Sequence, residues 1–339
     1  MRWSALVFAL LLSVPAEADG VADFYAGKTI NMIIGSDPGG SYDMNARLVA
    51  TYLSKYIPGH PSIVPQNLVG AGGIVGANNV YNLGAKDGTV IGATQRLVAF
   101  DPLLGDPGPK YDPLKIRWLG STAKEPGTLV VWHTAPHRRA EDLFTTELIV
   151  GGTQPGTDTI LYANVLNNVL GTKLKIVGGY AGSVPILLAM ERGEVQGVAN
   201  WSWSDINAAR PNWLRDKQIR ILLQIASARI PDLKDVPTAI EFARTDEQRA
   251  VLTLLMEMKD VGRPFFMAPA VPQERFEAVE AAFLAVMKDR EFVAENRQQK
   301  REVEPVAGAE MSAMLQHAYG LPPAIIEATR RAVKSPAAK

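Results

Sequence analysis

Short apolar runs alternate with helical repeats along the chain, and glycine-rich loops separate them. Three apolar runs predict strands at residues 29–35, 62–67 and 89–94. Between them, apolar residues recur at helical spacing behind Ser41, which is the predicted N-cap, and a further helix is expected to run to about residue 83. This alternation predicts an α/β fold with a mostly parallel sheet covered by helices.

The same alternation restarts near Leu148 and predicts a second α/β unit. Strands are expected at 149–150, 175–177, 195–199 and 220–225, and helices at 158–170 and 183–192. From Pro272 the chain is predicted to be helical again, with one apolar face formed by Phe276, Val279, Phe283 and Val286, and with a last helix at 322–333. The chain has 339 residues, too many for one ordinary core. We predict one domain at residues 23–124 plus 265–339 and another at 125–264, with crossings near 121–127 and 263–268.

Residues 1–18 have the pattern of a cleavable signal peptide. Arg2 precedes an apolar stretch at 3–14, and Pro15-Ala16-Glu17-Ala18 fits the small-x-small cleavage pattern, with cleavage expected after Ala18. The apolar stretch is shorter than the roughly 20 residues that span a bilayer. A buried first helix is the alternative. We expect a mature chain that is freely soluble, in the periplasm of a Gram-negative cell.

Composition excludes several classes of function. The 35 basic and 35 acidic residues balance, and without a basic run nucleic acid is a poor candidate partner. The chain has no cysteine, hence no disulfide, thiolate nucleophile or cysteine-based metal site. Pro136 lies between His133 and His137 and opposes a helical pair of metal ligands. We expect no cofactor and no metal.

Four glycine-rich loops each lead into a predicted helix, and they are the strongest candidate site. They lie at 39–41, 70–73, 151–157 and 182–183, and none contains Lys or Arg. In an open parallel sheet such loops gather at the carboxyl ends of the strands, where helix N-termini favour an anionic group. Backbone N–H groups and hydroxyls would then hold the anion. The alternative is that these are ordinary glycine turns.

Other kinds of binding or catalytic site have weaker support in the sequence. The stretch from Gly70 to Gly76 superficially resembles a dinucleotide loop, but Val75 stands where G-x-G-x-x-G needs glycine. A secreted serine hydrolase would use Ser41 or Ser183, and neither lies in a G-x-S-x-G elbow. Asp43 is either a base or an acid that serves the helix dipole. Trp201 and Trp203 either line a pocket or fill core.

Most of the predicted mature chain resembles the substrate-binding receptors of tripartite tricarboxylate transporters, the Bug receptors. The resemblance rests on the order and spacing of short motifs: Tyr25-Ala26-Gly27-Lys28-Thr29-Ile30, Pro38-Gly39-Gly40-Ser41-Tyr42-Asp43, Gly70-Ala71-Gly72-Gly73, Ala85-Lys86-Asp87-Gly88-Thr89, Gly179-Tyr180-Ala181-Gly182-Ser183, Val236-Pro237-Thr238 and Met267-Ala268-Pro269. Asp37, the Trp201–Trp203 segment and a predicted helical insert at 245–260 depart from the family pattern.

The resemblance implies a periplasmic binding protein fold, in which two α/β domains joined by two crossing strands close over a carboxylated solute. The solute, a di-, tri- or aromatic carboxylate, is then delivered to a membrane permease. A ligand-presenting accessory to a sensor kinase is an alternative, beside the hydrolase. We expect the ligand to be bound by Gly39, Gly40, Ser41, Asp43, Gly72, Gly73, Thr153, Gly156, Thr157, Asp158, Gly182, Ser183 and Asn200.

Overall fold

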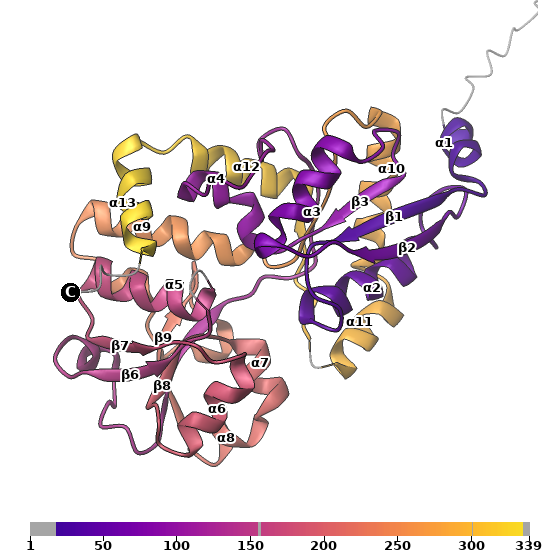
Figure 1. Cartoon of the computed structure of the whole chain (residues 1–339). Helices are drawn as coiled ribbons and strands as arrows, with labels where there is room; N and C mark the ends of the chain where they lie inside the picture. Colours follow the sequence, from indigo (N-terminus) through magenta and orange to yellow (C-terminus); the bar gives the residue numbers. More distant parts are fainter. Residues whose placement is uncertain (1–17, 155–156, 300, 335–339) are drawn as a thin grey trace, which may run out of the picture.

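The computed structural model describes residues 18–154, 157–299 and 301–334, and it consists of two lobes, each built on one sheet (Figure 1). The sheet of the first lobe has the strand order β11-β4-β10-β3-β1-β2. Its strands are β1 (Thr29–Ile34), β2 (Ser62–Asn67), β3 (Val90–Ala93), β4 (Arg117–Ser121), β10 (Pro264–Met267) and β11 (Val306–Ala307). The last two come from the far end of the sequence, so this lobe is assembled from both ends of the chain.

The sheet of the second lobe has the order β7-β6-β8-β5-β9. Its strands are β5 (Gly127–Trp132), β6 (Leu148–Gly151), β7 (Leu174–Val177), β8 (Gly197–Ser202) and β9 (Ile219–Ile225). Both sheets are mixed. β1 is parallel to β2 and β3, and β6 is parallel to β7 and β8, as the strand–helix alternation predicts. β5 and β10 follow the two passages between the lobes, and each is antiparallel to both of its neighbours.

Amphipathic helices cover the first sheet. They are α1 (Ala18–Tyr25), α2 (Ser41–Leu53), α3 (Ile74–Asn78), α4 (Asp101–Leu104), α10 (Gln273–Val286), α11 (Arg290–Gln298) and α12 (Gly308–Tyr319). The predicted apolar face of α10 is buried at Phe276, Val279, Phe283 and Val286. Gly40 occupies the N-cap position of α2 and Ser41 is the first helical residue, so the prediction of Ser41 as N-cap was wrong by one position.

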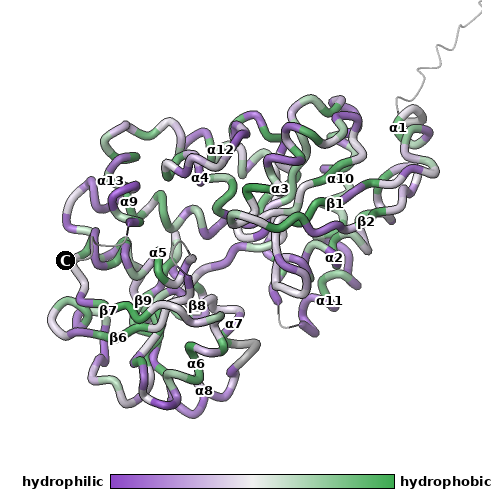
Figure 2. Tube along the Cα trace, in the orientation of Figure 1, coloured by the Kyte–Doolittle hydropathy of each residue, from purple (hydrophilic) through white to green (hydrophobic). Residues whose placement is uncertain are grey.

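The second lobe carries α5 (Asp158–Val165), α6 (Ser183–Glu191), α7 (Trp203–Ala209), α8 (Pro211–Arg215) and α9 (Asp246–Glu257). The C-terminal helix α13 (Pro323–Val333) packs against α9 and α5, and also against α4 (Figure 1). One apolar core therefore continues from the first lobe into the second along this edge. Apolar residues follow the strands of both sheets in Figure 2. Within the described residues, no helix combines the length and the apolar character needed to cross a membrane.

Candidate functional site

The first glycine-rich loop joins β1 to α2 and is fixed by a buried carboxylate. Asp43 accepts hydrogen bonds from the Gly39 N–H (2.8 Å), from Arg47 Nε (2.9 Å) and from Asn67 Nδ2 (2.7 Å). Burial raises the pKa of the Asp43 carboxyl, but these donors outweigh burial and lower it overall. Gly39 has φ +77°, a conformation that favours glycine. Asp43 therefore shapes the loop, and its oxygens are already bonded.

The second loop, at 70–73, reaches the ends of β1 and β3 only because of its glycines. A Cβ at Gly35 would lie 3.0 Å from Gly73 Cα, and a Cβ at Gly73 would lie 2.9 Å from Thr94 Oγ1. Gly73 also has φ +99°. The close approach buries Gly73 and leaves Gly72 exposed beside the first loop.

The third loop precedes α5 in the second lobe and is rich in hydroxyls. Thr153 Oγ1 lies 2.6 Å from Thr157 Oγ1 and 3.1 Å from Thr159 Oγ1, and Thr159 Oγ1 also accepts the Thr153 N–H. Gly156 lies outside the described residues. Asp158 is the first residue of α5, so its carboxylate lies at the positive end of that helix.

A cavity of 490 Å³ lies between the lobes where three of these loops meet. The first lobe contributes Tyr42, Ala71, Gly72 and the acidic residues Asp101 and Asp106, and the second contributes Thr157 and Asp158. Its volume is in the range of pockets that hold small-molecule ligands. Gly182 and Ser183, at the start of α6, are not among the described residues that line it.

Charged residues from outside the glycine-rich loops are buried beside this cavity. Arg96, in the turn after β3, also lines it. Its Nη2 pairs with Glu125, and its Nη1 lies 3.1 Å from Asp158 Oδ2. Lys259 Nζ donates to the same Asp158 oxygen over 3.2 Å. Arg263 Nη2 lies 2.6 Å from Glu125 Oε1. We call Arg96, Glu125, Asp158, Lys259 and Arg263 the charge cluster.

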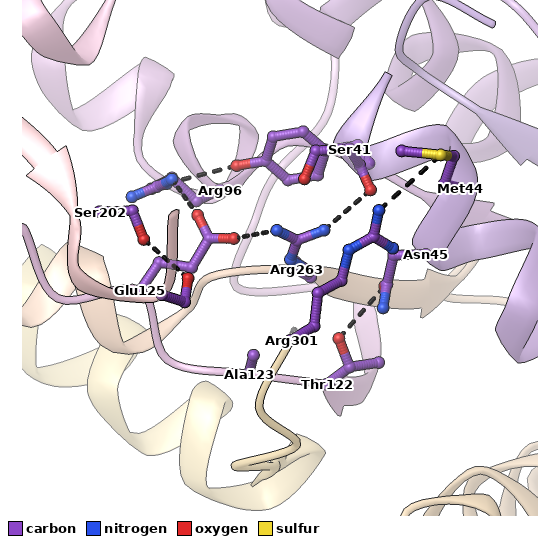
Figure 3. Close-up of polar contacts among 12 residues, drawn as sticks. Ser41, Met44, Asn45, Arg96, Thr122, Ala123, Glu125, Ser202, Arg263 and Arg301 are labelled. Atoms are coloured by element: carbon purple, nitrogen blue, oxygen red, sulfur yellow. Dashed lines mark hydrogen bonds and ion pairs between the residues drawn. The ribbon is translucent and has the colours of Figure 1, made fainter. Parts of the chain in front are cut away.

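Figure 3 shows how Arg96, Glu125 and Arg263 of the charge cluster lie beside Ser41 of the first loop. The Arg263 guanidinium lies between Glu125 and the Ser41 carbonyl, to which Nη1 donates a hydrogen bond of 2.8 Å (Figure 3). Arg96 Nε donates to the Tyr42 hydroxyl over 3.4 Å. The two arginines thus tie the start of α2 to Glu125, which lies in the passage between β4 and β5.

Both carboxylates of the charge cluster are ionised at neutral pH. Burial raises the pKa of Asp158, but the nearby Arg96 and Lys259 more than compensate and lower it to about 2. Glu125 has its pKa lowered in the same way by Arg263, Arg96 and Lys259 against the effect of burial. Three cations therefore face two carboxylates, and the charge cluster carries one excess positive charge.

Known proteins were compared with this chain by sequence and by structure. No family model matches it. A UPF0065 protein of Agrobacterium vitis, from the TAR-I ttuE-ttuC′ intergenic region, is 25% identical over 268 residues, which is 77% of this chain and 74% of that protein.

Solved structures of solute-binding proteins have the same fold. A TctC solute-binding protein from Polaromonas has a TM-score of 0.68 at 19% identity, covering 87% of this chain and 96% of its own. The periplasmic binding protein BugD has a TM-score of 0.63 at 19% identity. The match covers 91% of this chain and 98% of BugD. MatC from Rhodopseudomonas palustris, solved with bound malate, has a TM-score of 0.62 at 20% identity. The match covers 90% of this chain and 99% of MatC.

The protein resembles the Bug receptors. It has the periplasmic binding protein fold, as its sequence motifs predict, with two α/β lobes and mixed sheets. The alignment with these receptors spans nearly the whole chain, so the Bug-like fold includes both lobes and the passages between them.

In the cavity between the lobes the predicted ligand residues are only partly brought together. Gly72, Thr157 and Asp158 line the 490 Å³ cavity. Asn200, at the end of β8 with φ +60°, joins them through a hydrogen bond of 3.3 Å from Nδ2 to Asp158 Oδ2. Ser41 is adjacent through its carbonyl. The assignment of the remaining predicted residues to the ligand stays a prediction.

The cations of the charge cluster were not predicted from the sequence. We expected an anion to be held by backbone and hydroxyl groups, because the glycine-rich loops lack Lys and Arg. The structure brings Arg96 to the cavity from another segment and buries Lys259 and Arg263 behind it, in the charge cluster. One signal was available: Glu125 and Arg263 lie in the two predicted crossings, where the chain passes from one lobe to the other.

A second cavity, of 380 Å³, lies beside the passages between the lobes. Trp203 lines it together with Arg263 and Arg301, and Trp203 also packs in an apolar core of the second lobe. Trp201 is 3% exposed and lies in that core alone. Of the two interpretations left open for the pair, Trp201 therefore fills core, whereas Trp203 does both.

Proposed function

We propose that this protein is a solute receptor that captures a small carboxylated solute between its lobes and delivers it to a membrane permease. The observation that carries the proposal is the excess positive charge of the charge cluster beside a 490 Å³ cavity lined by glycine-rich loops. A buried charge without a partner raises the free energy of the protein. The excess positive charge of the charge cluster therefore favours binding of an anion in the cavity. Asp101 and Asp106 also line this cavity, so the excess positive charge is local to Arg96 and its partners, and that is where we expect the anion.

The solute class follows from the chemistry of the site. Helix N-termini, threonine hydroxyls and guanidinium groups all donate hydrogen bonds, and carboxylates accept them. The cavity volume suits a small di- or tricarboxylate or an aromatic acid. MatC, which has the same fold, was solved with malate, a dicarboxylate. We therefore propose an organic acid as the solute.

The proposal makes the protein a carrier and not a catalyst. The structural neighbours that share its fold carry the names of solute-binding proteins. A serine hydrolase needs a base beside its nucleophile. Among the described residues, no hydrogen bond joins the hydroxyl of Ser41 or Ser183 to a histidine. A ligand-presenting accessory would use the same cleft and differs only in its membrane partner.

The proposed mechanism is closure of the two lobes around the solute. Closure requires that the ligand contact the closed form better than the open form. We keep the boundaries 23–124 plus 265–339 and 125–264 as a proposal for the two moving units, with export directed by residues 1–18. Because α13 packs on α9 and α5, the edge of the molecule that contains α13 should move least.

A thermal-unfolding screen tests the proposed function. The purified chain would be heated with malate, citrate, adipate or benzoate, each matched in ionic strength with sodium chloride. A bound acid at 100 times its Kd stabilises the folded state by about 2.7 kcal/mol. At least one acid should raise the melting temperature in a concentration-dependent way, and its neutral amide should not. If no carboxylate in a broad panel stabilises the protein, the proposal is wrong.

A further inference from the structure

We propose that Arg96 forms a carboxylate-binding subsite which the protein's own Asp158 occupies in the absence of solute, and that a solute carboxylate replaces Asp158 there. This inference rests on the proposed function and names the residue that selects the carboxylate. It also reverses the role predicted for Asp158, which becomes a competitor of the solute.

Arg96 has a donor that the protein leaves without a hydrogen bond. The residue is 7% exposed, and Nη1 is buried and makes no hydrogen bond, although it lies 3.1 Å from Asp158 Oδ2. The contact is an ion pair in which no N–H is directed at the carboxylate. Nη2 is committed to Glu125, and Nε is directed at the Tyr42 hydroxyl. The Nη1 nitrogen is thus the one donor of Arg96 that lacks a hydrogen bond to any described residue, and Asp158 lies against it.

Asp158 is held loosely compared with the other carboxylate of the charge cluster. Its Oδ2 lies 3.1 Å from Arg96, 3.2 Å from Lys259 and 3.3 Å from Asn200. Charge-assisted N–H···O bonds usually measure about 2.7–2.9 Å, and the Arg263–Glu125 contact of 2.6 Å is at least as short. The Asp158 side chain is also 24% exposed, so it can turn away without unpacking a core.

Replacement by a solute carboxylate conserves the charge at Arg96 and adds a hydrogen bond. A carboxylate that enters from the cavity can accept a well-directed hydrogen bond from Nη1, which the Asp158 side chain, anchored at the start of α5, does not do here. Asp158 and the solute carboxylate carry the same charge and compete for the same cation. At the few ångströms that separate them they also repel each other.

The Asp158→Asn variant tests the competition directly. Asn has nearly the same shape and lacks the charge, so removing the competitor should strengthen binding of malate, or of the best acid from the screen, by at least tenfold. Arg96→Gln should weaken the same binding by at least tenfold. Arg96→Lys, which keeps the charge but not the planar edge, should fall between Arg96→Gln and the wild type. Binding would be measured by calorimetry, after circular dichroism has confirmed folding.

Asp216→Asn is the matched control for loss of one acidic charge from the second lobe. Asp216 lies on the surface beside Arg215, away from the cleft. This substitution should leave the affinity within twofold of the wild type. If Asp158→Asn binds no tighter than Asp216→Asn, or if Arg96→Gln binds as well as the wild type, the subsite assignment is wrong while the proposed function stands.

A second arm needs no natural solute, so it decides the inference even if every acid fails in the screen. In Asp158→Ala the missing side chain leaves room for free acetate at Arg96. Acetate, compared with chloride at equal ionic strength, should raise the melting temperature of Asp158→Ala by several degrees and leave the wild type unchanged. The double variant Asp158→Ala/Arg96→Gln should show no acetate effect. An acetate effect that is absent from Asp158→Ala, or that persists in the double variant, overturns the proposal.

Discussion

Lys259 offers a measurable consequence of the excess positive charge in the charge cluster. Its side chain is 2% exposed, its Nζ lies 5.1 Å from the centre of the Tyr162 ring, and it forms an ion pair with Asp158. Burial and the neighbouring Arg96 lower the pKa of the Lys259 ammonium from 10.5 to about 8, although Asp158 and Glu125 act in the opposite direction. The charged form of Lys259 therefore lowers the stability of the folded protein.

The sign of the pH effect follows from the two pKa values. Between about pH 8 and pH 10.5 the unfolded chain keeps a proton on Lys259 that the folded protein has lost. Stability rises with pH wherever the unfolded state binds more protons. Between pH 7 and pH 10 the contribution of Lys259 to the free energy of unfolding should rise by about 2.5 kcal/mol. Below pH 8 the lysine is charged in both the folded and the unfolded state, so the free energy of unfolding is lowered by the full cost of burying that charge.

Lys259→Met removes this contribution while keeping a long apolar chain. Urea unfolding of both proteins, followed by tryptophan fluorescence at pH 7, 8, 9 and 10, should give a difference in unfolding free energy that grows with pH in favour of the wild type. Lys175→Met, at an exposed position of β7, is the matched control and should show a constant difference. A constant difference for Lys259→Met would refute the reasoning, because Lys259 would then titrate alike in both states.

Three further predictions concern the loops and the N-terminus. Asp43→Asn should lower the free energy of unfolding by about 2 kcal/mol in urea titrations and weaken solute binding, because the carboxylate that holds the Gly39 N–H loses its charge; unchanged affinity would mean that this loop does not bind the solute. Gly127→Ala should cost about 1–3 kcal/mol by the same assay, because the added Cβ would lie 1.9 Å from Asn200 Oδ1, and a neutral result would contradict the packing described here. Mass spectrometry of the periplasmic fraction should find a mature chain that begins at Asp19, whereas a product that retains Met1 would contradict export.

The sequence by itself determined many of the elements and the glycine-rich loops that join them. Apolar runs of strand length and helical repeats are local signals, so β1, β2 and the buried face of α10 could be predicted before the fold was known. The glycines at 70–73 were recognisable because only residues without a side chain allow backbone to approach that closely. The order of short motifs was enough to indicate the Bug-like fold.

Only the tertiary structure decided which charges gather beside the cavity between the lobes. Arg96, Glu125 and Lys259 stand in three unrelated segments, and in the sequence each looks like an isolated surface charge. They become one cluster because β10 inserts between β3 and β4, which brings the end of the second passage beside the turn after β3. Likewise, no local pattern revealed that α13 packs on α9 and α5. Local periodicity indicates which face of an element is buried. Which other element covers that face depends on the strand order of the sheet.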